Sequence, residues 1–157
     1  PLNMSGTNIN LLSDSILMFW TGLTRPSELV LKEQDKKNKT NSAILDKMKV
    51  QALELSDLLN ENNISPLKIG KMLHKGWLLK KTLASKISNK KIDDWYQCAL
   101  NNGAYGGKIS GAGGGGFLTL IINSNKRIKL IKEMEKVGLK RYQFGLDSSG
   151  TIVTEIK

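Results

Sequence analysis

The sequence GAYGGKISGAGGGGF, at residues 103–117, is the stretch around which the rest of this chain is arranged. It contains eight of the 15 glycines in the chain, but it lacks the alternation with polar residues that is typical of flexible linkers. The hydrophobic pattern predicts a helix before it, at 92–102, and an apolar strand directly after it, at 117–122. We therefore expect a shaped loop that joins a helix to a strand, with backbone N–H groups that form an anion-binding concavity.

Two side chains add chemistry to this predicted loop. Lys108 carries a point charge and Ser110 a hydroxyl group, and both suit phosphate oxygens. A solvent-facing Lys108 is an equally good interpretation, whereas Ser110 sits among the glycines. Lys108 is followed by Ile109, and the loop precedes a strand instead of opening a helix. The sequence therefore fits neither the P-loop nor the dinucleotide-binding fingerprint.

Composition bounds the class of protein. The chain has 157 residues, 39% hydrophobic and 24% charged, which predicts one soluble globular domain over residues 1–157. Its single cysteine, Cys98, excludes an intramolecular disulfide framework and fits a reducing compartment. No apolar run reaches the length of a membrane span, and no secretory signal is visible at the N-terminus. We expect a cytoplasmic protein without a membrane partner.

The formal net charge of +10 at pH 7 attracts polyanions, which include nucleic acid, membrane surfaces and phosphorylated small molecules. The basic residues are spread over several segments, and aromatic residues are not interleaved with them as on a base-stacking surface. A solvated basic surface is therefore the favoured interpretation for most of these lysines.

Taken in order, the hydrophobic pattern predicts an α+β domain. The expected elements are a strand at 15–21, a helix from Thr24–Ser27 with Leu29, Val30 and Leu31 inward, a partly disordered or exposed helical stretch at 32–41, helices at 42–60, 67–83 and 92–102, a strand at 117–122, a helix from Ser124 to Gly138 with Ile128, Ile131, Met134 and Val137 inward, and strands at 141–146 and 151–156. Within 32–41 we favour partial disorder. Strands mixed with helices and a closing hairpin indicate an antiparallel sheet covered by helices on one face.

The sequence GGKISGAGGGGFL resembles the third conserved motif of the GHMP kinases, in which Lys, a hydrophobic residue and Ser or Thr precede Gly-Ala-Gly-x-Gly-Gly. The matching residues are Lys108, Ile109, Ser110, Gly111, Ala112, Gly113, Gly115 and Gly116. Three further stretches, at 19–25, 73–81 and 87–108, are similar to the sugar-phosphate branch that phosphorylates C1 of glycero-manno-heptose 7-phosphate. The resemblance extends from about Ser15 to the C-terminus.

This resemblance implies a ferredoxin-like antiparallel sheet covered by helices, as the C-terminal half of a kinase. In this family an N-terminal domain carries the ATP phosphate loop and the catalytic Asp, and neither stretch is present in this sequence, which starts at Pro1. The implied partners are therefore the N-terminal kinase domain, ATP with Mg²⁺, and a sugar phosphate used in carbohydrate metabolism such as lipopolysaccharide or capsule biosynthesis. The resemblance implies no catalytic residue and no metal ligand in this chain, and no activity for the chain alone.

The implied site residues fall into two groups. Phosphate-proximal loop residues are Gly107, Lys108, Ser110, Gly111, Ala112, Gly113, Gly114 and Gly115, and the candidates for the distal phosphate of the sugar are Arg25 and Lys81. Arginine suits bidentate phosphate contacts, although an arginine after a strand is otherwise a surface residue. The only histidine, His74, is expected to have a structural role, and Trp77 and Trp95 are expected to pack in the core.

Two other interpretations stay open. One is a non-enzymatic ferredoxin-like module that binds RNA or another polyanion, although the sequence shows no adjacent sheet aromatics in an RNP-like pattern, which disfavours nucleic acid. The other is a structural domain whose glycines serve close packing alone.

Overall fold

The computed structural model describes residues 4–147 of the chain. Its elements are α1 (Gly6–Ser15), β1 (Ile16–Trp20), α2 (Ser27–Lys36), α3 (Asn38–Leu59), α4 (Pro66–Leu83), α5 (Lys90–Asn101), β2 (Ala104–Ile109), β3 (Phe117–Ile122), a 3₁₀ turn (Ser124–Lys126), α6 (Arg127–Lys136) and β4 (Lys140–Tyr142). The strand expected at 151–156 lies outside the described residues.

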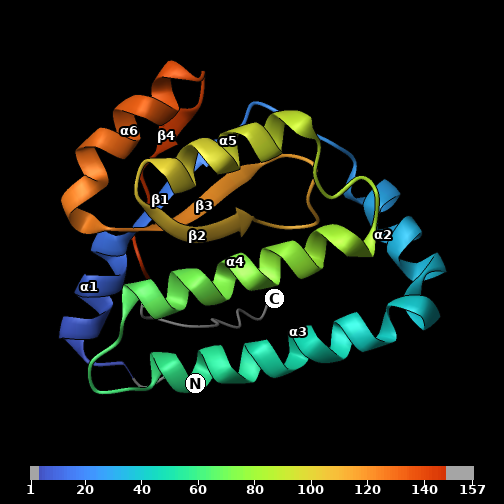
Figure 1. The fold of residues 1–157 in the computed structure, drawn as a ribbon, viewed down its shortest axis with the longest axis horizontal. Helices are drawn as coiled ribbons and strands as arrows, with labels where there is room; N and C mark the ends of the chain where they lie inside the picture. The colour runs from blue at the N-terminus through green and yellow to red at the C-terminus, as the bar shows by residue number, and fades with distance from the viewer. Residues whose placement is uncertain (1–3, 148–157) are drawn as a thin grey trace, which may run out of the picture.

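The four strands form one antiparallel sheet in the order β2-β3-β1-β4. The connection from β1 to β2 carries four helices and the connection from β3 to β4 carries α6, which is the split arrangement of ferredoxin-like folds. Figure 1 shows α5 across the sheet, α4 along it, and α3 packed outside α4. The predicted α+β fold with an antiparallel sheet is confirmed.

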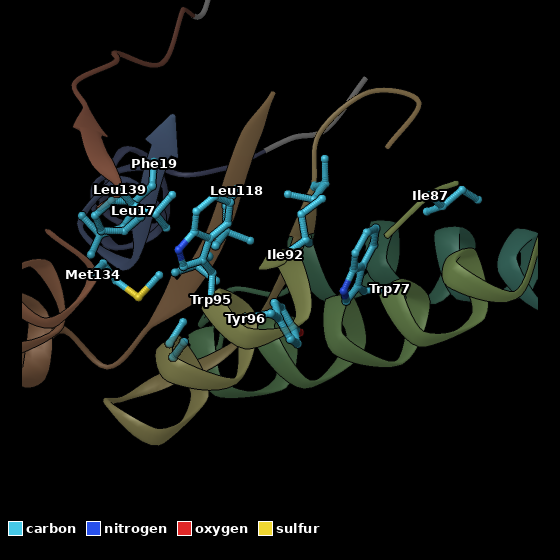
Figure 2. Close-up of a cluster of buried hydrophobic side chains, with 14 of the residues drawn as sticks. Leu17, Phe19, Trp77, Ile87, Ile92, Trp95, Tyr96, Leu118, Met134 and Leu139 are labelled. Atoms are coloured by element: carbon cyan, nitrogen blue, oxygen red, sulfur yellow. The ribbon is translucent and has the colours of Figure 1, made fainter. Parts of the chain in front are cut away.

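The main core lies between the sheet and the helices α5 and α6. Figure 2 shows Trp95 of α5 beside Leu118 of β3, while Tyr96 of α5 lies on the side of Trp77 of α4. The face of α5 that points to the core consists of buried residues, including the expected core residue Trp95: Ile92, Trp95, Tyr96 and Ala99. A large buried apolar side chain contributes about 1.5–3 kcal/mol, so this layer supplies much of the driving force for folding.

Within the described part of the chain, helices reach the second face of the sheet only at one end. Neighbouring strand residues point to opposite faces, yet Ile121 and Ile122 are both buried, because Ile121 joins a second cluster with Ile64 and Ile69. The expectation of a sheet covered on one face is thus wrong at this end. At the other end Phe117 and Thr119 stay partly exposed, so the second face is open there.

Short polar side chains begin helices α4 and α5, and glycines follow the ends of α5 and α6. Ser65 Oγ accepts a hydrogen bond from the backbone N–H of Lys68 at the start of α4, and Asn89 caps α5 in the same way. Gly103 and Gly138 follow α5 and α6 with φ of 112° and 87°. Each of these four residues acts through its own backbone or short side chain. At the predicted start Ser124 the cap is instead Asn123, and α2 has no side-chain cap.

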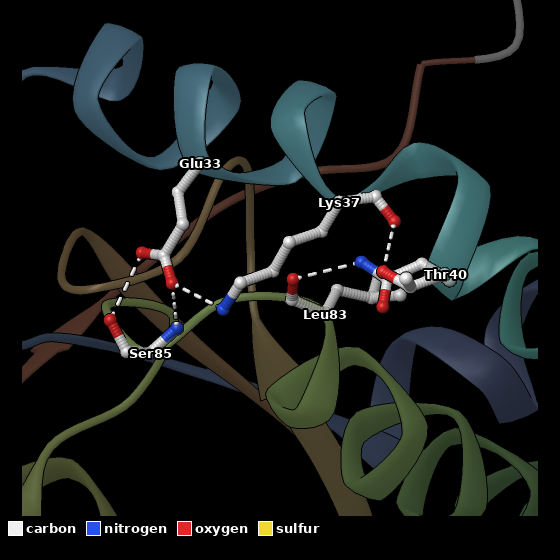
Figure 3. Close-up of polar contacts among 6 residues, drawn as sticks. Glu33, Lys37, Thr40, Leu83 and Ser85 are labelled. Atoms are coloured by element: carbon white, nitrogen blue, oxygen red, sulfur yellow. Dashed lines mark hydrogen bonds and ion pairs between the residues drawn. The ribbon is translucent and has the colours of Figure 1, made fainter.

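The expected disorder at 32–41 is wrong, because α2 and α3 run through this stretch with only Lys37 between them. Its polar side chains have partners (Figure 3): Glu33 accepts hydrogen bonds from the backbone and hydroxyl of Ser85 and pairs with Lys37 at 2.9 Å. These hydrogen bonds, and the charge of Lys37, lower the pKa of Glu33 to about 2. Asn41 also donates to the Leu83 carbonyl at the end of α4.

Further differences concern faces and boundaries. The stretch 103–117 is a strand in its first half, and α1 was not predicted. Leu31 is exposed while Val30 is buried. On α6 the predicted inward residue Met134 is buried, but Ile128 and Val137 are exposed and Leu130 is buried in their place. Strand β4 has three residues, and the expected inward residues Tyr142 and Leu146 are exposed.

Candidate functional site

The loop from Ser110 to Gly116 joins β2 to β3 and is fixed along one side by backbone hydrogen bonds. Gly114 N–H donates to the Ile87 carbonyl at 2.7 Å, and Gly116 N–H donates to the Leu23 carbonyl at 2.8 Å. The Gly116 carbonyl accepts from both the N–H and the hydroxyl of Thr21. The loop is therefore held by the segment after β1 and by the segment before α5.

The missing side chains of three glycines allow this contact. A Cβ at Gly113 would lie 2.9 Å from the Ile87 carbonyl oxygen, and one at Gly114 would lie 2.8 Å from the Lys86 carbonyl oxygen. A Cβ at Gly115 would lie 2.8 Å from the Leu23 carbonyl carbon. These three glycines thus serve close packing. For this part of the loop, the interpretation in which glycines serve packing alone is sufficient.

The opposite side of the loop is open. A Cβ at Gly111 would meet nothing within 4 Å, and φ values of 82° at Gly111 and 107° at Gly113 turn the backbone through the left-handed region. Within residues 4–147, the N–H groups of Gly111, Ala112, Gly113 and Gly115 have no hydrogen-bond acceptor. Successive free N–H groups in such a turn suit an anion such as a phosphate.

Ser110 fixes the start of the loop to β3. Its N–H donates to the Phe117 carbonyl at 2.9 Å, and its hydroxyl lies 2.8 Å from the hydroxyl of Thr119. Either hydroxyl can donate, so one of them keeps a free lone pair or proton for a ligand.

Arg25 lies beside this loop. Its guanidinium donates to the Lys86 carbonyl at 2.8 Å, and a Cβ at Gly114 would come within 3.2 Å of its side chain. With Trp20 and Thr24 it lines a hollow of about 210 Å³ whose other wall is the loop itself. The structure thus brings together Arg25 and the loop residues, which lie more than 80 positions apart in the sequence.

The two lysine candidates are placed differently. Lys81 forms an ion pair with Asp93 of α5 at 3.0 Å, and Lys108 is exposed on β2. Sequence reasoning missed Lys80, whose ammonium group donates to the Gly111 carbonyl. The available signal was its spacing: Lys80 follows the buried Trp77 by three residues, and so lies on the same face of the helix.

The sequence profile described as GHMP kinases C terminal matches residues 53–139, more than half of the chain. The chain belongs to the GHMP kinase family. Over 140 residues it is 29% identical to a D-glycero-alpha-D-manno-heptose 7-phosphate kinase of Campylobacter jejuni, covering 87% of this chain and 40% of that relative. The chain therefore spans about two fifths of the curated relative it matches.

Solved GHMP kinases have the same fold. A Leishmania major mevalonate kinase in complex with R-mevalonate superposes with a TM-score of 0.68 at 18% identity, over 81% of this chain and 41% of that one. A D-glycero-D-manno-heptose 1-phosphate kinase from Bacteroides thetaiotaomicron gives a TM-score of 0.60 at 16% identity, over 90% and 36%. The predicted family and the ferredoxin-like C-terminal domain are confirmed.

In this GHMP kinase domain a buried polar network supports the strand that leads into the loop. The Tyr96 hydroxyl lies 2.8 Å from His74 Nδ1, accepts from the Gly107 N–H at 3.2 Å, and lies 3.3 Å from the Gly107 carbonyl. Burial raises the pKa of Tyr96 to about 12. His74 stacks on the Tyr96 ring, so both residues hold α4, α5 and β2 together.

The polar groups around the loop are donors suited to phosphate oxygens.

Across the described range 4–147, no three His, Cys, Asp or Glu side chains gather in the manner of metal ligands. Over the same residues, no helix combines the length and hydrophobicity needed to cross a bilayer.

Proposed function

We propose that this chain is the C-terminal half of an ATP-dependent sugar-phosphate kinase that phosphorylates C1 of a heptose 7-phosphate or a related sugar. The observation that carries the proposal is the glycine loop, which is fixed by backbone hydrogen bonds to two other segments and has four N–H groups without an acceptor among residues 4–147. The 29% identity to the Campylobacter jejuni heptose 7-phosphate kinase supports the choice of sugar.

Phosphoryl transfer depends mainly on positioning and on neutralising charge. The bond from the γ-phosphorus to the β-phosphate oxygen breaks and a bond to the sugar hydroxyl oxygen forms. ATP with Mg²⁺ supplies the phosphoryl group and part of the neutralisation, while an N-terminal domain supplies the ATP loop and the Asp that accepts the hydroxyl proton. The free N–H groups of Gly111, Ala112 and Gly113 then donate to the transferred phosphoryl, because the fixed side of the loop holds them in place.

Arg25 is the proposed ligand of the distal phosphate of the sugar. It lies in the hollow beside the loop, and a guanidinium can donate two parallel hydrogen bonds to a phosphate. Lys81 is the second candidate; its side chain is 27% exposed, and binding a phosphate requires it to share or leave Asp93.

A chimera tests this function. The segment of the Campylobacter jejuni kinase that matches this chain is replaced by residues 1–157, and phosphate transfer from ATP to heptose 7-phosphate is measured with the chain alone as control. We expect turnover by the chimera and none by the chain alone. A folded chimera that binds ATP but phosphorylates no sugar phosphate contradicts the proposal, and so does turnover by the chain alone after contamination is excluded.

One observation favours a second candidate function, the binding of single-stranded RNA. The ring of Trp20 on β1 lies 5.0 Å from that of Phe117 on β3, and Phe117 lies 4.9 Å from Tyr142 on β4. The expectation that the sheet lacks adjacent aromatics is therefore wrong, because Trp20 and Phe117 are direct partners in the sheet register. Such rings on central strands stack bases in RNA-binding sheets of this topology.

Filter binding of the chain to single-stranded RNA at moderate salt separates the two functions. Binding that Trp20→Ala and Phe117→Ala abolish supports the RNA module. If the chain does not bind RNA and the chimera is active, the kinase function is supported and the RNA-binding function is excluded.

A further inference from the structure

A second cleft, of about 170 Å³, lies between α3 and α4 and shares no lining residue with the hollow beside Arg25. Its walls are mainly apolar side chains of the two helices, including Met48, Leu55 and Met72. Gly76 lets α3 come close, since a Cβ there would lie 3.2 Å from Gln51 Oε1. An apolar cavity of about 150 Å³ is large enough to hold benzene, so this cleft can hold a ring of similar size.

Two cations line the same cleft. Lys80 comes from α4 and Lys108 from β2, and the described residues that line the cleft include no Asp or Glu. Neither lysine belongs to any of the ion pairs found within residues 4–147. Burial lowers the pKa of Lys80, and the neighbouring charge of Lys108 lowers it further. Two like charges held together without a counter-ion favour the binding of an anion.

Trp77 supplies an independent observation. The residue is 1% exposed, it lines the cleft, and its indole Nε1 has no hydrogen-bond partner among the described residues. A buried donor without an acceptor is unfavourable, and most such groups in folded proteins have a partner. Because Trp77 lines the cleft, its indole N–H is a sensitive reporter of a ligand bound there.

We propose that this cleft binds a small phosphate monoester with an apolar body, with the phosphate held by Lys80 and Lys108 and the body between α3 and α4. The apolar walls disfavour a sugar, and the two ammonium groups match a dianion. Binding does not depend on the kinase activity proposed above.

The site is joined to the glycine loop through Lys80. Its ammonium group already donates to the Gly111 carbonyl, and its other two N–H donors can hold the phosphate at the same time. A ligand in the cleft therefore changes the environment of the first glycine of the loop. If the proposed function holds, this link gives the ligand an influence on phosphoryl transfer.

Nuclear magnetic resonance of the ¹⁵N-labelled 157-residue chain tests the binding. The readout is the indole N–H signal of Trp77, assigned with Trp77→Phe, during titration with phenyl phosphate, phenol, inorganic phosphate and glucose 6-phosphate. We expect phenyl phosphate to shift this signal saturably and to bind at least about 10-fold more tightly than the other three. One hydrogen bond to a charged group is worth about that factor, so Lys80→Gln and Lys108→Gln should each weaken binding about 10-fold. Lys75→Gln, which removes an exposed lysine of α4 outside the cleft, serves as the control and should change nothing.

A variant that keeps both lysines tests the contribution of the ligand's apolar body to binding separately from that of its phosphate. Ala52→Phe fills the cleft from α3, so it should abolish the effect of phenyl phosphate while weak binding of inorganic phosphate persists. Unchanged signals elsewhere in the spectrum establish that each variant is folded. The proposal is overturned if phenyl phosphate leaves the Trp77 signal unmoved, if the lysine variants bind as well as the control, or if glucose 6-phosphate binds more tightly. None of these outcomes bears on the chimera test of kinase activity.

Discussion

The two halves of the glycine-rich stretch use glycine for different reasons. In the strand half, Gly106 packs against the backbone of α4: a Cβ there would lie 2.8 Å from the carbonyl carbon of Gly70. In the loop half, Gly113 to Gly115 face the protein, while Gly111 faces open space and carries a free N–H group. A dense run of one residue type therefore contains a packing element and a candidate binding element, and only the three-dimensional structure separates them.

The largest expected effect is on the strand half. Gly106→Ala places a methyl group against Gly70 and His74 in a buried position, so we expect it to lower the free energy of unfolding by about 3 kcal/mol. Gly138→Ala is the matched control, because Gly138 has φ 87° and open space around it; it should cost about 1 kcal/mol. Urea denaturation measures both. Equal losses would show that Gly106 is not a packing residue.

The next effect concerns the fixed side of the loop. Gly113→Val meets the Ile87 backbone and should push the loop away by about 1 Å, which lowers kcat of the active chimera about 100-fold. The domain should stay folded, because the loop lies at its surface. Gly138→Val, at the end of α6, is the control for backbone strain. A kcat equal to that of the parent chimera would show that the loop only connects β2 to β3 and takes no part in phosphoryl transfer.

A smaller effect is expected for Arg25, which lines the hollow opposite the loop. Arg25→Ala in the active chimera should raise KM for heptose 7-phosphate about 10- to 100-fold, the worth of a hydrogen bond to a charged group, and leave KM for ATP nearly unchanged. Arg25→Lys should restore only part of the affinity, because lysine lacks the planar fork. If neither KM nor the preference for phosphorylated sugar changes, an unphosphorylated sugar becomes the better substrate.

The smallest effect tests the support of the strand half. Tyr96→Phe leaves the buried Gly107 N–H without its acceptor, at a cost of about 1 kcal/mol. The variant should also change the pH dependence. Because the pKa of Tyr96 is raised in the folded protein from its ordinary 10.0 to about 12, its contribution to stability is present below pH 10 and is lost as the pH rises through 12. Thermal unfolding from pH 8 to 12 should therefore show a steeper loss for the parent chain than for Tyr96→Phe; parallel curves would contradict this role.

Sequence reasoning succeeded where local rules apply. Ser65 and Asn89 cap helices through their own side chains, and the spacing of Trp95 and Tyr96 shows which face of α5 is buried. It failed where a partner distant in sequence decides the outcome. Strand β2 was missed because its glycines disfavour strand structure, and its pairing with β3 and contact with α4 compensate.

The candidate site shows the same division. The glycine motif alone predicted the loop and the family, and the loop residues do face an open hollow beside Arg25. Lys80 was not predicted as a site residue, because its contact with the Gly111 carbonyl joins residues 31 positions apart. The stretch at 32–41, predicted as partly disordered, is helical. Its residue Glu33 accepts hydrogen bonds from Ser85, which is too distant in the sequence for local patterns to reveal.

Titration of the ¹⁵N-labelled chain with inorganic tripolyphosphate tests most directly whether the open side of the loop binds phosphate. The free N–H groups of Ala112, Gly113 and Gly115 should shift saturably, because they have no acceptor among residues 4–147. The signals of Leu120 and Ile122 in β3 should stay in place, because these residues are buried and lie outside both proposed sites. Loop signals that do not move, or strand signals that move as far as the loop signals, would contradict a phosphate-binding role for this loop.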